Sequence, residues 1–208
     1  MEHYTSHGHK AICTPFAIDE DYYNYKQTDK YNYLDAIFVG NNYNYYDARH
    51  KAYLDVIQPF IDENKKIEVY GNNEWVNRDY NFNIEPQYYK GYMSHEETPY
   101  IFSSAKIILG VHSVVNSLTM QSMRTFEVLG CRGFFLSSYT KSVENMFENH
   151  VHLTYSSSPE ETKEIMDFYL NNEDARNKIA LAGQKLVYEK HTYKQRVNEI
   201  INALGKGE

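Results

Sequence analysis

Arg124 and Glu127 are three residues apart in a stretch with the pattern of a helix, and together they could bind a charged ligand that carries hydroxyl groups. Residues at this spacing leave the same face of a helix. The polar loop Ser117 to Thr119 precedes the helix, where free backbone N–H groups and the helix dipole favour an anion. A carboxylate further along can accept hydrogen bonds from sugar hydroxyls. A phosphate at the helix start and a ribose beside Glu127 would together describe a nucleotide.

A simpler explanation of the same two residues is a solvated ion pair. An exposed Arg and Glu three residues apart typically contribute about 0.3–0.5 kcal/mol to stability and have no other role. Spacing alone favours this simpler explanation, so the nucleotide hypothesis needs further support.

The elements around this pair follow from the local pattern. Met120, Met123 and Phe126 recur at helical spacing, which predicts a helix of about three turns with these side chains in the core. Glycines within 130–133 should end that helix. The short apolar run 134–136 is typical of a buried strand.

Short apolar runs alternate with helical patterns along the chain. We expect strands at 36–40, 66–70, 88–93, 106–112, 133–137 and 152–155. Helices are expected at 47–63, 96–104 and 142–148, and capping boxes at Ser158 with Glu161 and at Thr192 with Gln195 predict the starts of two later helices. Alternation of this kind predicts an α/β fold, a Rossmann-like doubly wound parallel sheet of about six strands.

Two strand ends carry residues that could contact a ligand, because ligands of open parallel sheets bind beyond the carboxyl ends of the strands. Gly40 and Asn41 follow the first expected strand, and His112 ends the fourth. A single glycine is weak evidence for phosphate binding. His112 fits a ligand contact and a structural role equally well.

Composition excludes several classes of protein. The net charge of −7 argues against nucleic acid or an anionic membrane as the main partner. Cys13 and Cys131 are the only cysteines, which argues against a disulfide framework and favours a reducing compartment. The first residues lack the pattern of a signal peptide, and the longest apolar runs are too short to span a bilayer. We therefore expect a soluble cytoplasmic protein without a transmembrane segment.

Several ordered motifs, spread over about residues 15 to 204, resemble a known family. They are Phe38-Val39-Gly40-Asn41 with Tyr70-Gly71, Arg124-Thr125-Phe126-Glu127 with Gly130, Ala182-Gly183-Gln184, and His191-Thr192-Tyr193 with Arg196. This pattern resembles the glycosyltransferase-like domain of CgeB-type and YkvP-type spore proteins, which belong to the family 1-like GT-B glycosyltransferases. The resemblance implies that residues 34–204 are equivalent to the C-terminal half of a GT-B enzyme. Residues 1–33 would then be a tail and the remnant of a linker from a missing N-terminal half.

The resemblance also implies roles for individual residues. Glu127 would bind the ribose hydroxyls, and Arg124 with the loop 117–122 would bind the diphosphate. The strand end at 91–94 would border the base. Retaining relatives often carry a second Glu eight positions before the ribose-binding one, where this chain has Thr119. The complete set of candidate nucleotide-sugar-binding residues is Glu127, Arg124, Thr119, Ser122, Gly40, Asn41, His112 and Ser94.

The implied function is transfer of a glycosyl group from a nucleotide-diphosphate sugar to an unknown acceptor, in spore surface or cell envelope glycosylation. A partner N-terminal half or a homodimer would complete the enzyme. No metal is expected, because helix-end donors and Arg124 could stabilise the departing diphosphate. The alternative is a non-catalytic nucleotide-binding or spore-structural module that keeps the fold.

Overall fold

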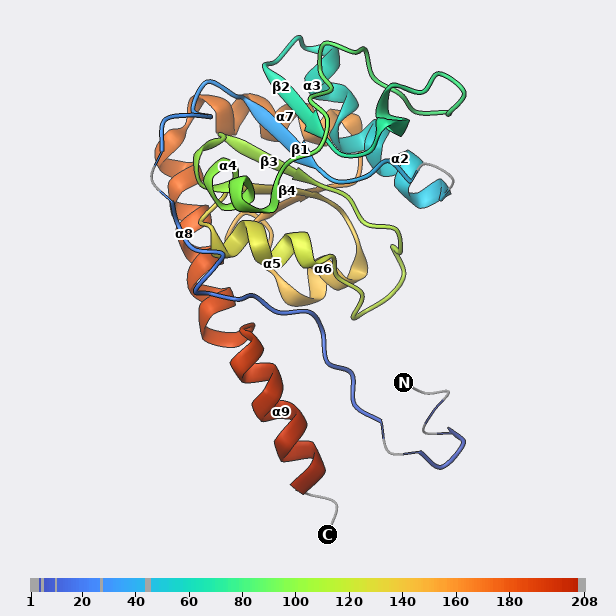
Figure 1. The fold of residues 1–208 in the computed structure, drawn as a ribbon, viewed down its shortest axis with the longest axis vertical. Coiled ribbons are helices and arrows are strands. Elements are labelled where there is room, and N and C mark those ends of the chain that lie inside the picture. Colours follow the sequence, from blue (N-terminus) through green and yellow to red (C-terminus); the bar gives the residue numbers. More distant parts are fainter. Residues whose placement is uncertain (1–3, 5, 10, 27, 44–45, 206–208) are drawn as a thin grey trace.

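The structure is a computed structural model. It describes residues 4, 6–9, 11–26, 28–43 and 46–205. Within these residues, parallel strands form one sheet of five in the order β2-β1-β3-β4-β5 (Figure 1). The strands are β1 (Ala36–Val39), β2 (Ile67–Tyr70), β3 (Ile107–Gly110), β4 (Phe135–Ser138) and β5 (Thr154–Ser156). The predicted α/β fold with a parallel sheet is confirmed.

Side chains that alternate along the strands build a core on each face of the sheet. In β1, Ala36 and Phe38 join the first core, whereas Ile37 and Val39 join the second. The first core lies under α2 (Asp47–Val56), α3 (Gln58–Asp62) and α7 (Pro159–Asn171). The second lies mainly under α4 (Thr98–Ser104), α5 (Met123–Gly130), α6 (Lys141–Met146) and α8 (Glu173–Lys190). Helices on both faces explain why the central strands β1 and β3 are apolar and buried along their whole length.

The third expected strand, 88–93, is wrong. Among the described residues this segment makes only an isolated bridge, from Tyr89 to Val69 on the edge strand β2. The Val69 N–H donates to the Tyr88 carbonyl at 2.8 Å, and the Lys90 N–H donates to the Val69 carbonyl at 3.0 Å. Gly91, with a φ of +79°, then turns the chain out of the extended conformation. The sheet therefore has one strand fewer than predicted.

The helix expected at 47–63 is divided into α2 and α3. Ile57 ends α2, and Pro59 lies in the first turn of α3. Proline has no N–H to donate to a carbonyl four residues earlier, so a continuous helix would lose a bond at this position. The helix expected at 96–104 likewise begins as a 3₁₀ turn, η2 (His95–Glu97), before α4; a second 3₁₀ turn, η1 (Asn73–Val76), follows β2.

The central helix is shorter than predicted. It begins at Met123, because the Ser122 hydroxyl caps it by accepting from the Arg124 N–H at 3.2 Å. Phe126 is fully buried as expected, but Met120 and Met123 are 36% and 44% exposed. Met120 precedes the helix, so the spacing that predicted a shared buried face did not apply to it. The buried strand predicted after this helix is confirmed.

The last two predicted helix starts are confirmed. Ser158 caps α7, and its hydroxyl accepts from the Glu161 N–H at 3.2 Å. Thr192 and Gln195 form a reciprocal pair at the start of α9 (Tyr193–Gly205). α9 extends away from the sheet (Figure 1), and the Arg196 Nε donates to the Pro15 carbonyl at 3.1 Å, which ties the N-terminal segment to it.

Candidate functional site

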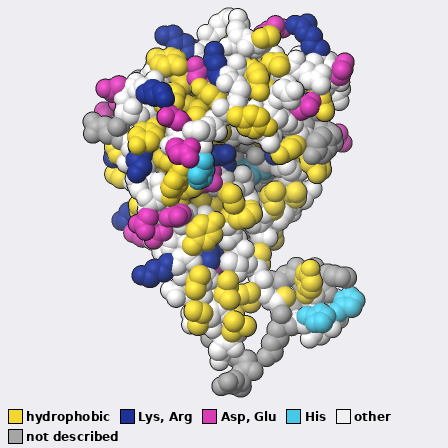
Figure 2. Space-filling view, in the orientation of Figure 1, with side chains coloured by type: hydrophobic (Ala, Val, Ile, Leu, Met, Phe, Trp, Pro, Cys, Tyr) yellow, Lys and Arg dark blue, Asp and Glu magenta, His cyan; other side chains and the backbone are white. Residues whose placement is uncertain are grey.

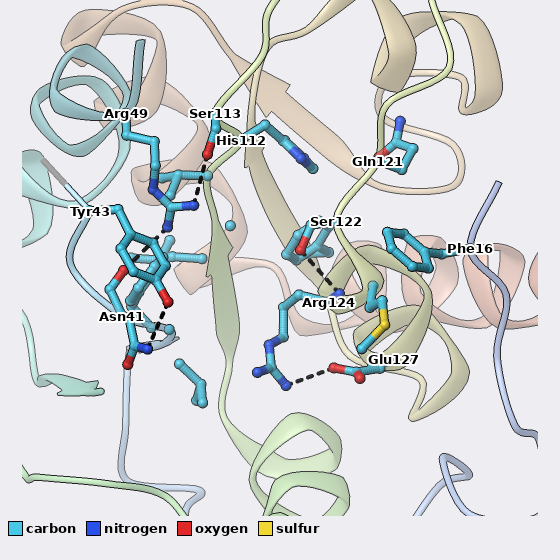
Figure 3. Close-up of a pocket in the computed structure, with 18 of the residues that line it drawn as sticks. Phe16, Asn41, Tyr43, Arg49, His112, Ser113, Gln121, Ser122, Arg124 and Glu127 are labelled. Carbon is cyan, nitrogen blue, oxygen red and sulfur yellow. Dashed lines mark hydrogen bonds and ion pairs between the residues drawn. The ribbon is translucent and has the colours of Figure 1, made fainter. Parts of the chain in front are cut away.

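A cavity of about 620 Å³ opens at the carboxyl ends of β1 and β3 (Figure 3). The chain leaves β1 towards β2 on one side and leaves β3 towards β4 on the other. This reversal of strand order is where parallel sheets of this kind bind their ligands, because the connecting loops diverge and leave a crevice. Gly40 and Asn41 line the cavity from the loop after β1, and His112 and Ser113 line it from the loop after β3.

Arg124 and Glu127 face the cavity from α5. The Arg124 Nη1 lies 2.7 Å from the Glu127 Oε2, and the two side chains are 28% and 10% exposed. The Arg124 guanidinium also lies over the Phe102 ring, 5.1 Å from its centroid. A carboxylate this buried is not half of an ordinary surface ion pair. The ion pair of the simpler explanation is present, but it is largely buried rather than solvated.

Arg49 is a second cation at the cavity, and the sequence did not reveal it. Its Nη1 donates to the Ser113 Oγ at 3.2 Å, and its Nη2 donates to the Asn41 carbonyl at 3.3 Å. The guanidinium also lies over the Tyr43 ring, 5.2 Å from the centroid. These contacts join the loop after β1 to the loop after β3. The sequence shows only an arginine soon after an expected strand and a glycine-containing loop. This pattern is too common in sequences to identify Arg49 as a site residue.

The loop after β1 is held by close backbone approach. The Trp75 Nε1 donates to the Gly40 carbonyl at 2.8 Å. A Cβ atom on Gly71 would lie 2.1 Å from that carbonyl oxygen, so this position accepts only glycine without a shift. The Asn41 Oδ1 accepts from the Asn72 N–H at 3.0 Å. Asn41 thus positions the loop with its side chain.

His112 is almost completely buried, with 2% of its surface exposed. Its Nε2 lies 3.1 Å from the Ser137 Oγ, and its Nδ1 has no hydrogen-bond partner among the described residues. Burial, with a smaller effect of the Arg49 charge, lowers the pKa of His112 to about 4. The imidazole is therefore neutral at physiological pH.

Of the eight candidate residues, six line the cavity and two do not. Those that line it are Gly40, Asn41, His112, Ser122, Arg124 and Glu127. The described residues of the cavity wall do not include Thr119, which lies in an exposed turn where its N–H donates to the Ser117 Oγ. They also do not include Ser94, which precedes η2. The wall adds Phe16, Tyr43, Arg49 and Ser113, which sequence patterns did not indicate, and Gln121, which lies in the loop 117–122 expected to bind the diphosphate.

In the part of the chain that the structure describes, no group of three or more His, Cys, Asp or Glu side chains is placed to hold a metal ion. No described helix is both long and apolar enough to cross a membrane. Cys13 and Cys131 are free thiols, exposed and buried respectively.

Comparison with known families decides what kind of domain this is. The model of the "Glycosyl transferase-like" family matches residues 49–202. The chain belongs to this family. By sequence alone, no curated protein matches the chain. The fold is that of the Rossmann-like half of GT-B glycosyltransferases, with the parallel sheet described above.

Solved structures with this fold are distant in sequence. Anabaena Alr3699/HepE in complex with UDP-glucose is 11% identical, with a TM-score of 0.68 over 91% of this chain and 56% of that one. The T4 phage β-glucosyltransferase with its UDP-glucose substrate is 13% identical, with a TM-score of 0.61 over 86% and 49%. Sucrose-phosphate synthase of Thermosynechococcus elongatus is 10% identical, with a TM-score of 0.68 over 93% and 52%. The chain thus spans about half the length of these structures.

Proposed function

We propose that this chain binds a nucleotide-diphosphate sugar and serves as the donor-binding half of a glycosyltransferase. One observation carries the proposal: Arg49, Arg124 and the buried Glu127 carboxylate face a single cavity at the point where the strand order reverses. Membership of the glycosyl transferase-like family and the fold shared with UDP-glucose-bound structures support it.

The two arginines suit a diphosphate. Guanidinium groups bind phosphate oxygens with paired hydrogen bonds that are strengthened by charge. Ser122 adds the capped start of α5, where backbone N–H groups and the helix dipole favour an anion. Because the whole chain carries a net charge of −7, these local groups must overcome an unfavourable overall field.

Glu127 suits the ribose. Its Oε2 accepts from Arg124, and the Tyr23 hydroxyl also interacts with this carboxylate. Because a carboxylate has about four acceptor positions, it can still accept a hydrogen bond from a ribose hydroxyl. The Arg124 bond fixes the direction of the carboxylate, and low exposure strengthens any hydrogen bond that it accepts. An amide at this position would replace an acceptor with a donor, which gives the proposal a direct test.

The proposed reaction breaks the bond between the sugar anomeric carbon and the diphosphate oxygen, and forms a bond from that carbon to an acceptor hydroxyl. The electron pair of the broken bond remains on the diphosphate, whose charge Arg49 and Arg124 would stabilise. The acceptor proton goes to a base or to solvent. We propose that binding of the diphosphate needs no metal ion, since cationic side chains supply the charge.

A second half would supply the acceptor surface. The apolar face of α9 is exposed along its length, with Val197 at 52%, Ile201 at 58% and Leu204 at 74%, and Figure 2 shows hydrophobic side chains gathered there. An apolar face of this kind favours contact with another protein surface. We propose that an N-terminal-half partner or a second copy of the chain covers it.

The biological setting that we propose is glycosylation of the spore surface or cell envelope, following the CgeB-like motifs. A second candidate function is nucleotide binding without turnover. Thr119 favours it, because this position lacks the second carboxylate of many retaining relatives and lies in an exposed turn away from the cavity wall.

Titration calorimetry of the whole chain with UDP, ADP, GDP and their glucosyl or mannosyl derivatives tests the binding proposal. We expect saturable binding of one nucleoside diphosphate and its sugar derivative. If the chain binds none of these ligands, the binding proposal is overturned. Release of free nucleotide from the bound sugar donor, with candidate acceptors present, then separates the transferase from the non-catalytic module.

A further inference from the structure

The unbonded ring nitrogen of His112 is a buried polar atom that the fold itself does not use. In the part of the chain that the structure describes, the Nδ1 has no hydrogen-bond partner, although His112 is 2% exposed. A buried polar atom without a hydrogen-bond partner is energetically unfavourable. Because His112 lines the cavity, a bound ligand is the natural partner for this atom.

The surrounding bonds decide which ring nitrogen carries the proton. The Ser137 hydroxyl donates its only hydrogen to the Ser138 carbonyl at 3.0 Å. With that hydrogen used there, the Ser137 Oγ acts as an acceptor towards His112, and we assign the ring proton to the Nε2, which lies 3.1 Å from it. In a neutral ring the Nδ1 then holds a lone pair and accepts hydrogen bonds. It would repel the oxygens of a phosphate and attract an O–H group.

Neighbouring polar groups do not satisfy this acceptor. The Gln121 amide nitrogen donates to the Ser142 Oγ at 3.1 Å, and its oxygen accepts from the Thr125 Oγ1 at 3.3 Å. The Arg49 guanidinium is bonded to Ser113, Asn41 and Tyr53. The donor that the Nδ1 lacks must therefore come from outside the described chain.

The place of His112 in the cavity indicates which hydroxyl this is. In the view of Figure 3, His112 and Glu127 lie towards opposite ends of the cavity, with Ser122 and Arg124 between them. A ligand with a ribose at Glu127 and phosphates at the start of α5 would extend its remaining group towards His112. We infer that the His112 Nδ1 accepts a hydrogen bond from a hydroxyl of the transferred sugar, and that it makes the site prefer the nucleotide sugar over the bare nucleoside diphosphate. This inference rests on the proposed function and assigns His112 a role in donor specificity.

Two substitutions of His112 distinguish the roles of its two ring nitrogens. His112→Gln places its amide group near the former Nε2 and keeps contact with Ser137, but it leaves no acceptor near the former Nδ1. His112→Asn does the reverse, because its Oδ1 occupies roughly the Nδ1 position. Calorimetry is done with UDP and UDP-glucose, ADP and ADP-glucose, and GDP and GDP-mannose. For each pair it gives the ratio of the affinity for the nucleotide sugar to the affinity for the nucleoside diphosphate.

For the pair that binds, His112→Gln should lower nucleotide-sugar affinity at least about fivefold, the effect of one hydrogen bond, and should change nucleoside diphosphate affinity less than about twofold. His112→Asn should retain more of the preference than His112→Gln. The unchanged diphosphate affinity also shows that the variant is folded. Equal losses for both ligands, or no loss for either, would overturn the inference while leaving the proposed function intact. If the wild-type chain binds no pair, both are overturned.

Deoxyfluoro analogues of the sugar identify the hydroxyl, because fluorine cannot donate a hydrogen bond. The wild type should bind one analogue more weakly than the parent nucleotide sugar. His112→Gln should bind that analogue and the parent with the same affinity, because in a double-mutant cycle the hydrogen bond is already lost. A structural role for His112 predicts the same loss for every analogue in both proteins, which would contradict the inference.

Discussion

Glu127 is held within the site by Arg124, whose Nη1 lies 2.7 Å from its Oε2 while only 10% of the Glu127 side chain is exposed. The pair therefore does two things at once. It neutralises a carboxylate that the fold has buried, and it leaves acceptor positions for a ligand on that carboxylate, although the Tyr23 hydroxyl also interacts with it. A solvent-exposed pair would do neither, and for that reason substitutions here should affect both ligand binding and stability.

Glu127→Gln should weaken binding of a ribonucleoside diphosphate such as UDP at least about tenfold, because hydrogen bonds to charged groups are worth about 1.5–3 kcal/mol. The 2′-deoxy analogue already lacks one hydroxyl and should lose less. Calorimetric titration of both proteins with both ligands forms a double-mutant cycle. Strictly additive losses would show that Glu127 does not contact the ribose.

Arg49→Met should lower the affinity for UDP at least about tenfold and leave the affinity for uridine nearly unchanged. A charge-assisted phosphate contact is worth about 1.5–3 kcal/mol, and only UDP carries the phosphates. The matched control is Arg78→Met, which removes the same charge from an exposed side chain whose nearest carboxylate, on Glu85, is 3.5 Å away. Equal effects of the two variants would mean that only the overall charge matters. Arg49→Lys keeps the charge but loses the bonds to Ser113 and Asn41, so intermediate affinity is expected.

The sequence predicted the parts of the site that depend on one element or on strand order. Arg124 and Glu127 share a helix, so their spacing alone placed them on one face. Gly40 and His112 end parallel strands, so a parallel sheet was enough to place both at the same edge. In each case a local pattern and a simple topology fixed the position.

The remaining features depend on contacts between distant segments. Arg49 reaches Ser113, 64 residues further along the chain, and no local pattern signals that contact. The segment 88–93 has the composition of a strand, but it meets only the edge of β2 before Gly91 turns it away. Met120 has helical spacing to Phe126, yet the Ser122 cap starts the helix after it. Tertiary contacts and caps decided these positions.

The buried His112 makes stability depend on pH. Its folded pKa of about 4 lies below the unfolded value of about 6.5, so below pH 6.5 the unfolded chain binds a proton that the folded chain does not. The free energy of unfolding should therefore fall as pH decreases from about 6.5 towards 4, by up to about 1.4 kcal/mol per pH unit from this group.

Urea unfolding at several pH values measures this effect. His112→Gln should show a smaller decrease than the wild type over the same range. His191, whose pKa is also lowered to about 4 mainly by burial, remains in both proteins and contributes equally to each. The same slope in both proteins would mean that His112 is not kept neutral by the fold.

Removal of divalent metal should leave the affinity for UDP within about threefold, less than about 0.7 kcal/mol, if Arg49 and Arg124 supply the charge that the diphosphate needs. Titrations with a chelator and with added Mg²⁺ or Mn²⁺ provide the measurement. Arg49→Met is the comparison variant. If added metal restores its UDP affinity, the metal ion replaces the positive charge of Arg49. Loss of wild-type binding in the chelator would contradict the metal-free proposal.

The contact between Gly71 and Gly40 offers a test of how the loop after β1 is held. Gly71→Ala would place a Cβ atom 2.1 Å from the Gly40 carbonyl oxygen and 2.8 Å from the Trp75 Nε1, so the loop must shift and the bond between those two groups must break. We expect a loss of about 2–4 kcal/mol in the free energy of unfolding, in the range of strongly destabilising substitutions. The emission of Trp75, the only tryptophan, should change in the folded state. UDP affinity should fall because Asn41 lies in this loop and its carbonyl accepts from Arg49. Gly91→Ala is the control: its φ of +79° costs about 1–2 kcal/mol in strain, but a Cβ atom there meets nothing within 4 Å. If Gly71→Ala leaves the tryptophan emission and the UDP affinity at the values of Gly91→Ala, the close approach does not position the site.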